Sequence, residues 1–121
     1  MYVAAGEHLE ADKLARQIVD ALSDKQAEDV LLLDIRDVAS FADYFVIATG
    51  GVKRQLEAMS DVVGDIIQDQ VKLMGREGDA ESGWILLDYG DLIVHLFAPQ
   101  ERDYYDIEGM WDTATPLVRI Q

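Results

Sequence analysis

The chain has 121 residues, and its 24 acidic side chains outnumber its 10 basic ones, which gives a formal net charge of −14. Half of the residues are apolar and none is cysteine, so the composition predicts one folded domain and excludes disulfides and zinc–thiolate sites. No apolar run is long enough to span a membrane, no signal peptide is recognisable, and the excess of acids disfavours non-specific contact with nucleic acid.

The first predicted elements are a helix and a strand. Leu14, Ile18 and Leu22 recur at four-residue spacing, which predicts an amphipathic helix over 9–27. The continuous apolar run at 30–35 is short and bounded by charge, so it favours a strand that is covered on both faces.

A second strand and a second helix follow a connection at 36–43. Residues 44–49 are rich in strand-forming side chains, and Gly50-Gly51 after them supplies a turn. An apolar stripe at helical spacing then predicts a helix over 52–74, with Gly75 as its stop.

The next part of the chain predicts a hairpin. The polar, glycine-rich segment 76–83 predicts a loop, and strands are expected at 84–88 and 92–98, joined by a tight turn at Tyr89-Gly90. Alternation in the second strand places two sets of side chains on opposite faces of the sheet, namely Leu92, Val94 and Leu96 against Ile93, His95 and Phe97.

The last part of the chain predicts a short helix at 102–111 and a tail at 113–121 with no assigned structure or role. The order of the elements predicts an α/β (α+β) fold with a mixed sheet flanked by helices. Because no repeat, linker or low-complexity segment interrupts the sequence, residues 1–121 are expected to form a single domain with a core over about 8–112.

Few residues in this sequence suit catalysis. There is no thiol nucleophile, and the two histidines are His8, near the terminus, and His95, in the middle of a predicted strand. A single strand histidine is more often a hydrogen-bonded structural residue than a base or a ligand, and no second ligand stands at a diagnostic spacing. We therefore expect no metal and no cofactor.

One turn could contact a phosphate group. Gly50-Gly51 lies between a strand and a helix, with Arg54 shortly after it, and such a turn can present free amides to an anion. The spacing matches neither the P-loop nor the dinucleotide fingerprint. A nucleotidyltransferase would also need a metal-binding pair of acids on a strand after the turn, whereas Asp61 and Asp65 fall on one face of the predicted helix. We interpret the glycines as a tight turn.

Aromatic residues near strand ends suggest a protein-binding surface. Trp84 begins a predicted strand and Tyr89 lies at the hairpin tip, and tryptophan and tyrosine dominate binding hot spots. We expect the two to form one aromatic patch, although packing within the core is an alternative for each. The acids expected to rim this patch are Glu77, Asp79, Glu81, Asp88 and Asp91. An aromatic patch with an acidic rim suits a basic protein partner better than a small molecule.

Several motifs in this chain resemble the ribosomal silencing factor family RsfS, also called the Iojap family. The segments that carry the resemblance are 43–50, Arg54-Gln55, Glu77-Gly78 and 83–97, followed by Arg102, Tyr104-Tyr105, Ile107-Glu108 and Met110-Trp111. They occur in the family's order over about residues 10–111. One position departs from the pattern, because the family usually has serine near the start of the second helix and this chain has Val52, which cannot cap a helix.

This resemblance implies a fold like that of nucleotidyltransferases without their catalytic acids, and a function without enzymatic turnover. It implies a cytoplasmic protein that binds the large ribosomal subunit through ribosomal protein uL14. Bound there, it would block joining of the small subunit and so repress translation. Mitochondrial and chloroplast relatives are linked to assembly of the large subunit, and dimers are known among relatives, so a homodimer is possible.

The resemblance also implies partner-binding residues. Trp84 and Tyr89 match positions of the family's partner surface, and Tyr105 matches a further position near the end. We add Asp91 and Glu77 because acids beside the aromatic patch would favour a basic partner. Two alternatives remain open at this point: a degenerate, nucleotide-binding nucleotidyltransferase, and a homodimeric scaffold whose aromatic patch pairs with itself. No membrane partner and no sequence-specific nucleic-acid target is expected.

Overall fold

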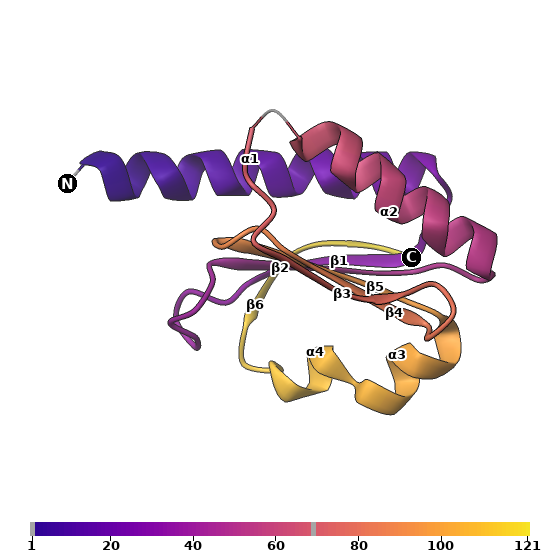
Figure 1. Ribbon diagram of the computed structural model, residues 1–121. Coiled ribbons are helices and arrows are strands. Elements are labelled where there is room, and N and C mark those ends of the chain that lie inside the picture. The colour runs from indigo at the N-terminus through magenta and orange to yellow at the C-terminus, as the bar shows by residue number, and fades with distance from the viewer. Residues whose placement is uncertain (1, 69) are drawn as a thin grey trace.

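Helices cover both faces of a six-stranded sheet in the computed structural model, which describes residues 2–68 and 70–121 (Figure 1). Helices α1 (Tyr2–Asp24) and α2 (Lys53–Ile67) lie on one face, and α3 (Pro99–Tyr105) and α4 (Ile107–Met110) lie on the other. This arrangement confirms the predicted mixed sheet flanked by helices. No helix in the described part of the chain is long and apolar enough to cross a membrane.

The sheet has the strand order β3-β4-β5-β2-β1-β6. The central pair β2–β5 is parallel and every other neighbouring pair of the described strands is antiparallel. The strand bounds are β1 Glu28–Asp34, β2 Tyr44–Thr49, β3 Gly75–Asp79, β4 Trp84–Asp88, β5 Leu92–Phe97 and β6 Thr115–Ile120. Strands β2 and β5 are buried along their whole length, because helices pack on both faces of the sheet at its centre.

The predicted hairpin is confirmed. Strand β4 pairs with β5, and the turn between them is closed by the Tyr89 amide, which donates to the Leu92 carbonyl at 2.9 Å. Gly90 has a φ of +88°, a conformation that glycine adopts without steric penalty. The predicted alternation also holds, since Leu92, Val94 and Leu96 join the core under α1 and α2 while Ile93 and Phe97 join the core on the other face.

Helix α2 is shorter than predicted. Its buried stripe is Leu56, Met59, Val63 and Ile67, but the helix ends at Ile67 and Val71 is exposed. The prediction of a helix to 74 is wrong because the apolar period continues past the point where the chain turns toward the sheet. There the Met74 amide donates to the Asp88 carbonyl, and β3 begins.

The start of α2 is stabilised without a serine cap. Val52 makes no side-chain capping bond, as its chemistry requires. Instead the Gln55 side chain reaches back and accepts a hydrogen bond from the Gly51 amide at 2.7 Å. This bond resembles the reciprocal half of a capping box and satisfies one amide ahead of the helix.

Two edge strands were absent from the sequence prediction. The expected loop contains β3, whose residues Gly-Arg-Glu-Gly-Asp have no apolar alternation and are held by backbone pairing with β4. The expected tail contains β6, which pairs with β1 and covers its outer edge. Edge strands are partly solvated, so their sequences need little apolar character, and Pro116 near the start of β6 is tolerated for the same reason.

The helix predicted at 102–111 is two short helices. Asp106, with a φ of +47°, separates α3 from α4 and caps α4 by accepting a hydrogen bond from the Gly109 amide. Helix α3 begins three residues earlier than predicted because Pro99 occupies its first turn, where a missing amide hydrogen has no cost.

Candidate partner-binding surface

The structure places Trp84 and Tyr89 on opposite faces of the sheet. In β4, Ile85 and Leu87 point to the core under α1 and α2, while Trp84 and Leu86 point to the face that carries α3 and α4. Tyr89 packs into the α1–α2 core and is only 6% exposed. The two aromatic residues therefore do not form the single patch that was expected, because they lie an odd number of residues apart in extended chain.

Trp84 instead packs beside Tyr105. The two ring centroids are 4.5 Å apart, and the indole also stacks on Phe97 with centroids 5.0 Å apart. Trp84 is partly buried, whereas Tyr105 is 42% exposed. The structure thus brings together two of the predicted site residues, one from the start of β4 and one from the end of α3.

His95 contacts the indole of Trp84 through a hydrogen bond. The indole Nε1 donates to His95 Nδ1 at 3.3 Å, and the imidazole is 4% exposed. Burial lowers the pKa of His95 to about 4, so the ring is neutral at pH 7. Because Nδ1 accepts the indole N–H, the proton of the neutral ring is assigned to Nε2. This contact agrees with the interpretation of His95 as a hydrogen-bonded structural residue.

Aromatic rings in contact form a continuous row across this face of the sheet. The aromatic row consists, in order of contact, of Phe41, Trp111, Phe45, His95, Trp84, Tyr105 and Tyr104. Neighbouring ring centroids lie between 4.5 and 6.0 Å apart. The two ends are open to solvent, with Phe41 56% and Tyr104 80% exposed. Phe41 and Trp111 were not expected at the site, since no spacing in the sequence connects them to β4.

Acidic side chains border the aromatic row on one side. Glu77 of β3 lies opposite Leu86, and Asp79 lies opposite Trp84, so both carboxylates project from the same face of the sheet as Trp84. Both are exposed. Glu77 is therefore placed near Trp84 as the charge argument anticipated.

Asp91 lies elsewhere, beside Tyr89. Together with residues of α1, including Leu14, these two line a hollow of about 440 Å³ between the helix and the hairpin turn. Asp91 is exposed and its backbone carbonyl accepts hydrogen bonds from the amides of Asp43 and Tyr44. Tyr89 and Asp91 thus belong to a region separate from the aromatic row.

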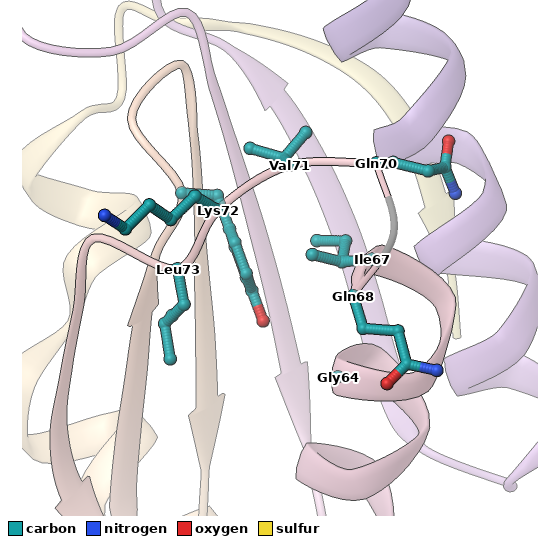
Figure 2. A pocket seen from close by; sticks show the side chains of 8 residues that line it. Gly64, Ile67, Gln68, Gln70, Val71, Lys72 and Leu73 are labelled. Carbon is teal, nitrogen blue, oxygen red and sulfur yellow. The ribbon is translucent and has the colours of Figure 1, made fainter.

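A second hollow of about 610 Å³ adjoins the end of α2 (Figure 2). Its lining residues are Gly64, Ile67, Gln68, Gln70, Val71, Lys72, Leu73 and Tyr89. Figure 2 shows the polar ends of Gln70 and Lys72 pointing in opposite directions rather than toward a common centre. Among the described residues that line it there is neither a carboxylate nor a histidine.

The Gly50-Gly51 turn has its amides occupied. The Gly50 amide donates to the Phe97 carbonyl at 2.9 Å, and the Gly51 amide donates to Gln55. A Cβ on Gly50 would lie 2.9 Å from Met59 Sδ, so glycine is needed here for close packing of the turn against α2. These contacts support the interpretation as a tight turn. Across the residues that the structure describes, no cluster of three or more potential ligands could hold a metal ion.

The fold is shared by solved bacterial structures and defines a class of small mixed α/β proteins. A Chromobacterium violaceum protein of known crystal structure superimposes with a TM-score of 0.79 and 33% identity, covering 84% of this chain and 86% of that one. A Bacillus halodurans structure gives a TM-score of 0.73 at 32% identity, covering 91% of this chain and 98% of that one.

Sequence comparison specifies the family within this class. Residues 8–121 match the family model described as "Ribosomal silencing factor during starvation". Ribosomal silencing factor RsfS of Bacillus subtilis is 41% identical over 103 residues, which cover 83% of this chain and 85% of the relative. The chloroplastic protein Iojap of Zea mays is 31% identical over 95% of this chain and 50% of its own length. The chain belongs to the RsfS family, which confirms the resemblance found in its motifs.

Proposed function

We propose that this protein is a cytoplasmic translation repressor without enzymatic activity, which binds ribosomal protein uL14 on the large ribosomal subunit and blocks joining of the small subunit. Membership in the ribosomal silencing factor family supports a ribosome-associated role in translation. The observation that carries the proposed site is the packed, solvent-accessible pair Trp84 and Tyr105, toward the Tyr104 end of the aromatic row.

The aromatic row suits a protein partner. Large rings already fixed by packing lose little conformational freedom on binding and can fill pockets of a partner. Glu77 and Asp79 beside the row add negative charge, which favours a basic surface such as that of a ribosomal protein. The net charge of −14 disfavours general contact with ribosomal RNA, and so favours binding where protein is exposed.

The proposed surface keeps three of the five expected residues, namely Trp84, Tyr105 and Glu77. Tyr89 and Asp91 lie in the separate region beside α1, where they would need a second contact with the partner. Because the aromatic row is open to solvent at both ends, a homodimer formed through it would compete with uL14 for the same surface.

Replacing Trp84 by alanine is expected to weaken binding to isolated large subunits by about 2 kcal/mol, or roughly 30-fold, because a hot-spot tryptophan is removed. Co-sedimentation measures the affinity, and light scattering of mixed subunits measures whether joining is still blocked. The matched control is Met74→Ala, which removes a 70% exposed apolar side chain outside the aromatic row and should change neither. A folded Trp84→Ala protein with unchanged binding and unchanged inhibition of joining would refute the site.

Binding to the large subunit is also expected to weaken steadily as the KCl concentration rises, because an acidic rim meets a basic surface. Glu77→Gln should reduce this salt dependence. Asp65→Asn, which removes an exposed charge on α2 at the opposite face, should leave it unchanged. Equal effects of the two substitutions would show that only net charge matters and that Glu77 does not lie at the interface.

A role in large-subunit assembly is the second candidate, favoured by one relative. The Mus musculus protein "Mitochondrial assembly of ribosomal large subunit protein 1" is 27% identical over 87% of this chain. The two roles differ in the form of the large subunit that the protein must bind. Repression acts on mature subunits, whereas assembly acts on immature ones. Inhibition of joining with purified mature subunits therefore supports repression, and binding confined to immature subunits supports assembly.

A further inference from the structure

His95 is buried among apolar side chains at the centre of the sheet. On β5 it lies between Leu86 of β4 and Ile47 of β2 in register. Phe45 and the imidazole form an edge-to-face pair with ring centroids 4.7 Å apart, and the ring of Phe97 lies parallel to the imidazole with centroids 6.1 Å apart. Within the described residues the only hydrogen bond to the imidazole comes from Trp84, and Nε2 has no partner.

We propose, building on the function proposed above, that His95 is a positioning residue for partner binding, which fixes the indole of Trp84 by accepting its N–H. The imidazole sits below the sheet surface and is too buried to touch a partner itself. Its effect on binding therefore passes through the Trp84 ring, whose direction the hydrogen bond selects.

The need for this bond follows from the position of Trp84. Stacking on Phe97 and the tilted contact with Tyr105 restrain the indole plane, but these contacts alone do not distinguish between orientations of the ring within that plane. Because Trp84 is only partly buried, its N–H could turn out to water if Nδ1 were absent. A ring that is directed toward Nδ1 in the free protein loses less freedom when the partner binds.

A buried histidine with one unpartnered nitrogen is a poor choice for packing alone. The unsatisfied buried N–H at Nε2 destabilises the fold, and a phenylalanine of similar size would fill the same space without that penalty. A purely structural role thus predicts that the variant with phenylalanine at this position is at least as stable as the native protein and binds the large subunit at least as tightly. A positioning role predicts that phenylalanine preserves the fold but impairs binding.

Two variants separate these roles. His95→Phe keeps a ring and removes the acceptor, and is expected to keep the unfolding temperature while lowering affinity for the large subunit about three- to tenfold. His95→Asn places an amide oxygen near the position of Nδ1 but leaves a void, so it should lower the unfolding temperature yet bind better than His95→Phe. His95→Phe should therefore be the more stable of the two variants, and His95→Asn should bind the large subunit more tightly.

The indole itself provides a readout in the free protein. The Trp84 N–H signal in a ¹⁵N–¹H spectrum, assigned with Trp111→Phe, should exchange slowly with solvent in the native protein and in His95→Asn, and faster in His95→Phe. In a Trp84→Phe background, which lacks the donor, His95→Phe should cause no further loss of affinity.

Native affinity and native N–H exchange in His95→Phe would overturn the proposal. Affinities that simply follow the unfolding temperatures of the two variants would overturn it as well, since they indicate a structural role. If the native protein does not bind large subunits, the proposed function fails, and the N–H exchange rates still decide whether His95 fixes Trp84.

Discussion

Replacing Arg102 by methionine is expected to destabilise the protein by about 3 kcal/mol, because it breaks a buried charged network and leaves the Glu108 carboxylate without its ion-pair partner. The Arg102 side chain is 7% exposed. Its Nε and Nη2 both donate to Glu108, at 3.0 and 2.8 Å, and Nη1 donates to the Asp29 carbonyl and the Thr49 hydroxyl, at 2.6 and 2.9 Å.

These bonds explain why one side chain has so large an effect. They join α3 to α4 and attach both helices to the start of β1 and the end of β2. Arg102 thus attaches the α3 segment that carries Tyr105 to the sheet, so partner binding should fall together with stability. Arg102→Lys should recover only part of the loss, because an ammonium cannot reproduce the planar fork of donors.

Urea unfolding at pH 7 measures the loss. The matched control is Arg16→Met, which removes a solvent-exposed pair with Asp12 on α1 and should cost no more than about 0.5 kcal/mol. Similar small losses in both variants would contradict the assignment of Arg102 as a structural anchor.

Acidification is expected to remove up to about 3 kcal/mol of stability through His95 alone. Burial lowers the pKa of His95 from its ordinary value of 6.5 to about 4, so the folded state binds a proton less readily than the unfolded state. The stabilisation of the neutral ring is complete above pH 6.5 and disappears as the pH falls from 6.5 through 4.

Free energies of unfolding at pH 7 and at about pH 4.5, compared between the native protein and His95→Phe, test this expectation. Carboxylates titrate in both proteins, so the difference between the two pH dependences isolates His95. The native protein should lose stability more steeply on acidification. Identical slopes would show that His95 is protonated in the folded state without penalty.

Much of the fold follows from the sequence where burial is strong. The segments of β1, β2 and β5 carry apolar runs because helices cover both faces of the sheet centre, and these strands were predicted within one or two residues. The edge strands β3 and β6 were not predicted, because backbone pairing rather than side-chain burial holds them. Helix α2 was extended too far because Val71 continues the apolar period without being buried.

The site was predictable only in part. Trp84 and Glu77 could be selected from composition and motif, and the structure places them on one face. The separation of Tyr89 from Trp84 depends on strand alternation and on where the turn begins, which the sequence alone leaves uncertain by a residue. Tyr105 and Phe41 join the aromatic row because of the way α3 and the 36–43 connection pack on the sheet, which no local sequence pattern encodes.

The pairing of β6 with β1 has a consequence for how the protein is made. Val30 pairs with Ile120, so the outer edge of β1 finds its partner only after residue 120 has been synthesised. Chains leave the ribosome from the N-terminus onward, so β6 is the last of the six described strands to become available for pairing. Until β6 pairs with it, the outer edge of β1 exposes unpaired backbone groups, which can bind a strand of another chain.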